Sequence, residues 1–182
     1  LNHCFLRVTA ASISRAGAAA EGIGCYTPVG EEEAYAVILP PDFQLLAQRE
    51  GSFGERLIAA TKDLLAVGFA SVCLIDSDSP TVSSAAFAEA VEVLARPHDT
   101  IVLGPSDDGG SYLIGMKELH PRVFAGLDCS LEAVHELTES RAAVAGLNVH
   151  PATPGLHCDT LPTLPPPNHR LPPADATPPP PP

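Results

Sequence analysis

Short apolar runs alternate with segments of helical periodicity along most of the chain. Continuous apolar runs at Val72–Ile75 and Thr100–Leu103 predict buried strands, because a strand covered on both faces shows no polar side. Between them Phe87, Val91 and Leu94 recur at helical spacing. A strand, a helix and a second strand in this order predict parallel strands joined by a right-handed crossover.

The same patterns predict the other elements. We expect helices over residues 1–13 and 31–39, from the loop at 48–54 to Gly68, and from Ser130 to about Ala145. We expect strands over residues 24–28, 43–47, 111–116 and 147–150. The alternation indicates an α/β protein with a mostly parallel sheet.

An acidic turn follows each of the two predicted strands Val72–Ile75 and Thr100–Leu103. Asp76 and Asp78 come after one strand, and Asp107 and Asp108 after the other. Open α/β sheets bind ligands beyond the carboxyl ends of their strands, so we expect these side chains at one rim. Clustered carboxylates repel unless a cation offsets their charge, and hard oxygen ligands suit Mg²⁺ or Mn²⁺. The alternative is ordinary turns, since Asp, Ser, Gly and Pro favour them, but two such turns together favour a site.

A glycine-bearing loop before the third predicted helix is a second candidate site. Gly51, Gly54, Glu55 and Arg56 stand where backbone N–H groups and a helix N-terminus could hold a phosphate or a sugar hydroxyl. The alternative is a turn in which Glu55 supports the start of the helix.

Three segments together resemble one family. Residues 51–57 (GSFGERL), 74–81 (LIDSDSPT) and 102–115 (VLGPSDDGGSYLIG) resemble the DUF2064 family of glycosyltransferase-A-like proteins, relatives of molybdenum-cofactor and phospholactate guanylyltransferases. The resemblance covers roughly residues 1–160. It implies a three-layer, Rossmann-like nucleotide-diphospho-sugar transferase fold, in which Asp78 matches the strand-end metal aspartate.

The resemblance also implies a role for a residue near the C-terminal end of the domain. Asp159 matches a further metal carboxylate, although His157 and Cys158 replace the residues that precede it in the family. The segment Leu127–Ser130 departs from the family pattern as well. In the second acidic turn, we expect a catalytic role for Asp107 or Asp108. Either one, with Gly109 and Gly110, would hold acceptor hydroxyls or orient the attacking group, because glycine allows close backbone approach.

The beginning of the chain departs from the family as well. Similar proteins open with a strand and a basic, glycine-bearing loop, and this chain enters the following helix midway. The resemblance therefore implies an N-terminally truncated domain whose first, central strand is missing. Such a domain should bind nucleotides weakly and associate readily, because unpaired strand edges template aggregation.

Composition narrows the classes of partner. The chain has 182 residues, a net charge of −12 and 20 prolines, many of them in residues 161–182. We expect one domain over 1–160 and a proline-rich, disordered tail over 161–182. The negative charge opposes binding to nucleic acid or anionic membranes. Five dispersed cysteines, no signal peptide and no membrane-length apolar run favour a cytoplasmic protein.

These observations predict a metal-dependent glycosyltransferase-like or nucleotidyltransferase-like protein. Its ligands would be a nucleotide or nucleotide-sugar and a small-molecule acceptor. The alternative is a non-catalytic binding or regulatory remnant of the same fold. The residues leave the donor, the acceptor, the transferred group and the oligomeric state open.

Overall fold

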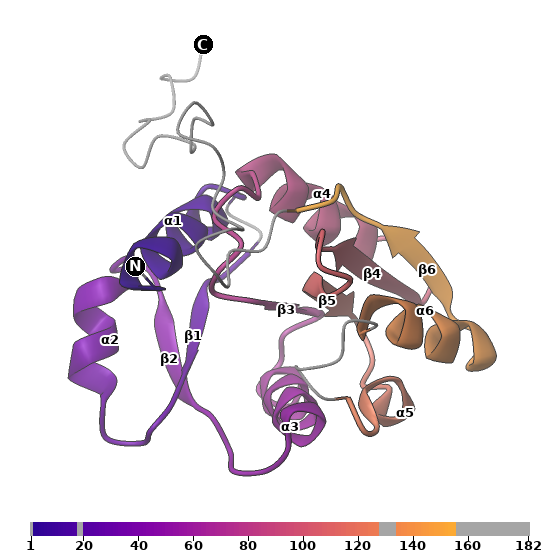
Figure 1. Cartoon of the computed structure of the whole chain (residues 1–182), viewed down its shortest axis with the longest axis horizontal. Coiled ribbons are helices and arrows are strands. Elements are labelled where there is room, and N and C mark those ends of the chain that lie inside the picture. Colours follow the sequence, from indigo (N-terminus) through magenta and orange to yellow (C-terminus); the bar gives the residue numbers. More distant parts are fainter. Residues whose placement is uncertain (1, 18–19, 128–133, 156–182) are drawn as a thin grey trace.

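The computed structural model describes residues 2–17, 20–127 and 134–155 (Figure 1). The helices are α1 (Asn2–Ser14), α2 (Glu32–Ile38), α3 (Phe53–Ala66), α4 (Ser84–Leu94), α5 (Pro121–Phe124) and α6 (Val134–Val144). The strands are β1 (Ile23–Tyr26), β2 (Gln44–Ala47), β3 (Val72–Ile75), β4 (Thr100–Pro105), β5 (Ser111–Met116) and β6 (Asn148–Pro151).

The described strands form two sheets. Strands β1 and β2 pair in parallel, and the larger sheet has the order β3-β5-β4-β6. Strand β5 is antiparallel to both β3 and β4, while β4 and β6 are parallel. Strands β3, β4 and β6 therefore run in one direction, as the strand–helix–strand pattern predicts, and β5 is a reversed strand inserted between β3 and β4.

Local capping explains where the two longest central helices begin. The Ser52 hydroxyl accepts a hydrogen bond from the Glu55 N–H, and the Glu55 carboxylate accepts one from the Ser52 N–H. This reciprocal arrangement satisfies two N–H groups that the helix itself leaves unpaired. Ser83 caps α4 through a bond from the N–H of Ala86. The helix predicted from Ser130 is described from Val134 onward, so its proposed cap lies outside the described residues.

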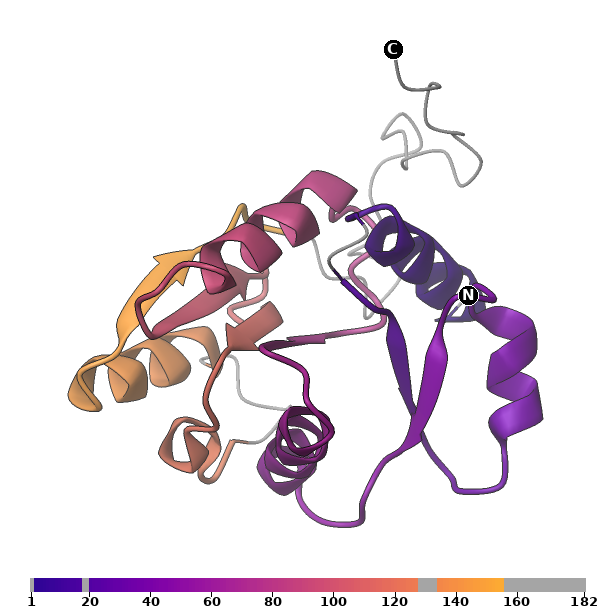
Figure 2. The ribbon, with the colours of Figure 1, turned by 180° about the vertical axis from the view of Figure 1, so that it is seen from behind.

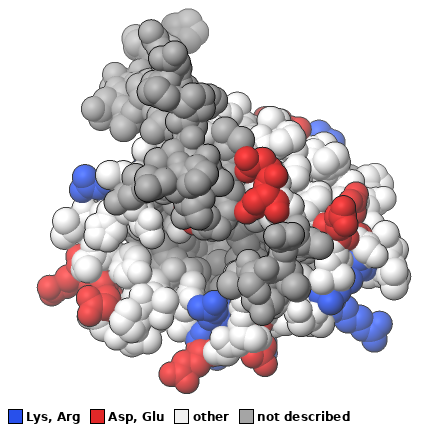
Figure 3. Space-filling model, in the orientation of Figure 1, with Lys and Arg blue, Asp and Glu red and all other residues white. Residues whose placement is uncertain are grey.

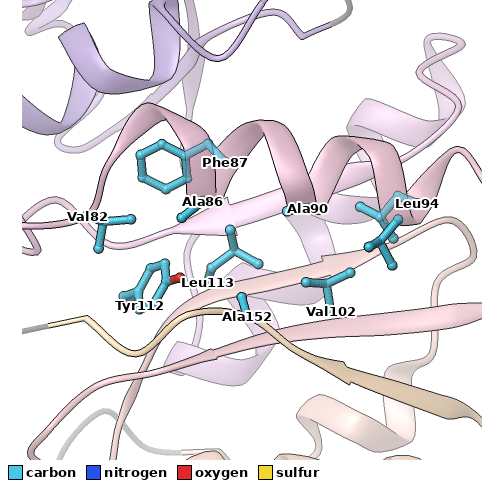
Figure 4. Packing of buried hydrophobic residues seen from close by; sticks show 10 residues of the cluster. Val82, Ala86, Phe87, Ala90, Leu94, Val102, Tyr112, Leu113 and Ala152 are labelled. Atoms are coloured by element: carbon cyan, nitrogen blue, oxygen red, sulfur yellow. The ribbon is translucent and has the colours of Figure 1, made fainter.

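Helices cover both faces of the larger sheet, which confirms the three-layer α/β class (Figure 2). On one face α4 packs against β4 and β5, and α1 contacts α4. Figure 4 shows Phe87 and Leu94 of α4 directed at Val102, Tyr112 and Leu113 of the sheet. On the other face α5 and α6 enclose a second cluster of buried side chains that includes Ile101, Met116, Val123 and Phe124.

A large cavity lies between the two sheets. Its volume is about 1240 Å³, and residues of β1, β3, α1 and α3 line it. In Figures 1 and 2, β1 and β3 diverge, with α1 on one side of the space and α3 on the other. Among the described residues, no strand pairs with the sides of β1 and β3 that face this cavity.

Candidate active site

The turn after β3 places two carboxylates at the cavity. Asp76 and Asp78 both line it. The Asp76 N–H donates to the Tyr112 carbonyl at 3.1 Å, which extends the pairing of β3 with β5 by one residue. Asp76 Oδ2 accepts a hydrogen bond of 2.9 Å from the hydroxyl of Ser79, which is buried. The backbone and the Ser79 hydroxyl thus hold Asp76 at the strand end, as the sequence predicts.

The N-terminus of α3 also reaches the cavity, but its acidic residue has a structural role. The Glu55 carboxylate accepts hydrogen bonds of 2.8 Å from both the N–H and the hydroxyl of Ser52. These bonds lower the pKa of Glu55 below its ordinary value. Glu55 was predicted to bind substrate, and its placement instead matches the alternative in which it supports the start of the helix.

Arg56 is the cationic residue of this helix end. It lines both the large cavity and a smaller one of about 320 Å³ that Gly51 also lines. Its Nη1 donates a long bond of 3.5 Å to Gln48 Oε1. Within the described part of the chain, its Nε is buried and has no hydrogen-bond partner. A guanidinium in this position can bind an anion without first breaking a strong ion pair.

Gly54 has a packing role in the structure. A Cβ on this residue would lie 2.3 Å from the carbonyl oxygen of Phe124 in α5. The absent side chain therefore lets α3 approach the backbone of α5, and this contact accounts for the glycine without any ligand.

Hydrogen bonds to the Asp108 carboxylate stabilise the loop between β4 and β5. Asp108 Oδ1 accepts bonds from the Ser106 hydroxyl at 2.6 Å and from the Gly110 N–H at 3.0 Å. Gly109 has φ of 87°, a conformation that favours glycine, and a Cβ on Gly110 would lie 2.8 Å from Ser106 Oγ. Asp107 and Asp108 are both exposed. They do not line the large cavity, so the four aspartates do not meet at one cavity wall.

A Ser–His pair lies beside this loop, and the sequence did not predict it. Ser111, the first residue of β5, lines the large cavity, and its hydroxyl lies 3.0 Å from His135 Nδ1. The backbone N–H of His135 donates a hydrogen bond of 3.2 Å to the carbonyl of Gly109, and this bond fixes the start of α6 against the loop. The two residues are 24 positions apart, so no local motif could have revealed the pair.

The carboxylates at β3 suit a divalent cation by their chemistry. Asp76 and Asp78 supply hard oxygen ligands of the kind that Mg²⁺ and Mn²⁺ prefer. The third predicted ligand, Asp159, lies outside the described residues. Over residues 2–17, 20–127 and 134–155, no three His, Cys, Asp or Glu side chains are grouped closely enough to hold a metal ion. The described part of the predicted metal site therefore consists of two carboxylates.

On the face in Figure 3, Lys and Arg side chains stand at separate places, interspersed with acidic ones. No helix in the described ranges is both long and apolar enough to cross a bilayer.

Comparisons with known proteins agree with this architecture. The chain is similar to a protein from Desulfovibrio desulfuricans G20 whose crystal structure is described as that of a "putative nucleotide-diphospho-sugar transferase". The TM-score is 0.78 at 27% sequence identity, over 87% of this chain and 69% of the other. No curated protein matches the sequence significantly. A family model described as "Uncharacterized protein conserved in bacteria (DUF2064)" matches residues 10–131, about two thirds of the chain. The chain therefore belongs to the DUF2064 family.

Proposed function

We propose that the protein binds a nucleotide-diphospho-sugar at the polar end of the large cavity and transfers its sugar to a hydroxyl group of a small acceptor. One observation carries the proposal: Asp76, Asp78 and Arg56 come from two separate elements and line the same cavity. Carboxylates for a cation and a guanidinium for phosphate are the groups that a diphosphate requires. The similarity to the Desulfovibrio protein supports the class of donor.

The residues at the polar end divide into two roles. Asp76 and Asp78 would hold Mg²⁺ or Mn²⁺, which when bound would neutralise charge on the leaving diphosphate. Arg56, with its buried and unpartnered Nε, would bind a phosphate oxygen. Glu55 would not contact the donor, because its carboxylate caps α3 and its charge would repel phosphate.

The acceptor side would be formed by the end of β5 and the neighbouring loop. Ser111 lines the cavity, and His135 Nδ1 lies within hydrogen-bond distance of its hydroxyl. An acceptor hydroxyl that donates to Ser111 Oγ could pass a proton through that hydroxyl to His135, the usual side chain for proton transfer near neutral pH. Asp107 would bind an acceptor hydroxyl. Asp108 would stabilise the conformation of the loop through its hydrogen bonds with Ser106 and Gly110.

A thermal-shift panel tests donor binding. The chain is heated with nucleotides and nucleotide-sugars at millimolar concentration, with and without Mn²⁺, because a ligand that binds the native state raises its stability. We expect a nucleotide-sugar to stabilise the chain only with Mn²⁺, and Asp78→Asn to abolish that shift. Glu139→Gln, which alters an exposed carboxylate on α6, is the matched control and should keep it. An unchanged shift in Asp78→Asn would contradict the metal assignment.

Product analysis tests the transfer itself. Mass spectrometry of reactions with candidate acceptors separates glycosyl products from nucleotidyl products, a choice that the residues leave open. Asp108→Asn and His135→Ala should lower turnover more than nucleotide affinity. Donor binding without any product across the acceptor panel would favour the non-catalytic alternative. Equal loss of nucleotide affinity in Asp108→Asn and Asp78→Asn would show that the acceptor side is misassigned.

A further inference from the structure

The chain after β6 continues beside β4 and reaches the loop between β4 and β5. Residues 152–155, here called the post-β6 segment, follow β6 directly. The Ala152 N–H donates to the Leu103 carbonyl at 2.8 Å. The Gly155 N–H donates to the Pro105 carbonyl at 2.9 Å, and the Gly155 carbonyl accepts a bond of 3.2 Å from the Asp107 N–H. The segment therefore extends the pairing of β6 with β4 into the loop that carries Asp107.

The loop between β4 and β5 has two separate restraints. Inside the loop, the Asp108 carboxylate accepts hydrogen bonds from Ser106 and Gly110. The Asp107 backbone is instead bonded to Gly155, which lies outside the loop. The first restraint stabilises the conformation of the loop itself. The second fixes Asp107 relative to the rest of the sheet, and it depends on the post-β6 segment.

The side chain of Tyr112 holds the post-β6 segment against the sheet. Tyr112 lies in β5 and is completely buried, and its hydroxyl donates a bond of 2.7 Å to the Thr153 carbonyl. Figure 4 shows its ring next to Val82 in the same apolar cluster. A Cβ on Gly155 would lie 2.9 Å from both the Tyr112 ring and Val82. The glycine therefore lets the segment pack closely on the ring.

We propose that Tyr112 is a positioning residue for the acceptor: through the post-β6 segment, its hydroxyl holds Asp107 where the hydroxyl group of the acceptor binds. The inference rests on the proposed function, in which Asp107 binds that group. Tyr112 is linked to the donor side through its backbone, because the Asp76 N–H donates to the Tyr112 carbonyl. Removal of the Tyr112 hydroxyl should therefore loosen Asp107 and leave Asp76 in place.

Amide hydrogen exchange, followed by NMR on the full chain, tests this restraint without any ligand. Tyr112→Phe removes the hydroxyl and keeps the ring. The loss of one hydrogen bond should speed exchange of the Asp107 and Gly155 amides about fivefold, since exchange requires local opening. The Asp76 amide should exchange at the parental rate, because its acceptor is a backbone carbonyl that the substitution retains.

Two further variants make the comparison specific. Tyr35→Phe is the matched control, because the Tyr35 hydroxyl also donates to a backbone carbonyl, that of Thr27, at 3.1 Å. It should leave exchange of the Asp107 amide unchanged. Gly155→Ala places a Cβ against the Tyr112 ring and should displace the post-β6 segment, so exchange at Asp107 should rise here as well. This second variant decides the matter if Tyr112→Phe does not fold.

Kinetics separate positioning of the acceptor from a general loss of structure. With an acceptor that yields product, Tyr112→Phe should raise the KM for the acceptor about fivefold, because the free energy of restoring the loop is drawn from acceptor binding. The KM for the donor and the Mn²⁺-dependent thermal shift should stay at their parental values.

Other outcomes would overturn the proposal. Parental exchange at Asp107 in both Tyr112→Phe and Gly155→Ala would show that the segment does not restrain the loop. Exchange that rises equally at Asp76, or a KM that rises equally for donor and acceptor, would show a general structural role instead. Failure of the proposed function is distinguishable: a parent chain that binds no donor and forms no product would remove the acceptor role, while exchange at Asp107 would still report the restraint by Tyr112.

Discussion

Gly54→Ala should lower the stability of the fold, although alanine favours helices more than glycine does. A Cβ at this position would lie 2.3 Å from the Phe124 carbonyl oxygen, and the obstacle is backbone that cannot rotate away. Overpacking of this kind costs about 1–3 kcal/mol. The gain in helix propensity offsets up to about 1 kcal/mol of that cost. Taken near the middle of both ranges, the net loss should be about 1–2 kcal/mol, or about 2–8 °C in Tm for a chain of this size.

Thermal unfolding followed by circular dichroism measures this loss. Ala59→Gly in the same helix is the control, because it reports the propensity term alone and should cost about 0.5–1 kcal/mol. A Gly54→Ala variant that is as stable as the parent would refute the packing argument. If that stable variant also lost nucleotide binding, the result would support the sequence prediction that Gly54 binds substrate.

Three further predictions follow from pKa shifts and composition. Hydrogen bonds from Ser52 lower the pKa of Glu55, so the stabilisation from this carboxylate is present above its ordinary pKa of 4.5 and is lost as pH falls through the lowered value. In urea denaturation, the difference in stability between Glu55→Ala and the parent should therefore be larger at pH 7 than well below pH 4.5; a difference that does not change with pH would contradict this. Burial raises the pKa of the Cys73 thiol to about 12, so its alkylation at pH 8 should be much slower than that of exposed Cys4, and equal rates would show that Cys73 is not shielded. Deletion of 164–182 should leave Tm within about 2 °C, because a proline-rich segment buries little apolar area, and a larger fall would mean that the tail packs on the domain.

The sequence alone determined most of the secondary structure. The predicted strands at 72–75 and 111–116 have the same bounds as β3 and β5, and Phe87, Val91 and Leu94, which recur at helical spacing, lie in α4. These features are local: a run of apolar residues, a capping hydroxyl or a glycine after a helix acts within a few residues of chain. The short helix α5 was not predicted, because four residues carry no periodicity.

The sequence also determined the location of the metal candidates at a strand end. Asp76 and Asp78 line the cavity because a carboxyl end of a strand is a fixed place in an α/β sheet. The family resemblance, on three motifs, indicated the same fold as the comparisons do. The third ligand, Asp159, and the domain and tail boundaries stay predictions from the sequence.

Tertiary structure alone decided what each candidate side chain touches. The sequence places Glu55 and Gly54 in a loop that could hold a phosphate or a sugar hydroxyl, and the structure shows that Glu55 caps α3 and Gly54 admits the backbone of α5. Ser111 and His135 meet only because α6 folds back onto the loop after β4. These are contacts between segments far apart along the chain, and they depend on packing geometry that residue type and spacing do not encode.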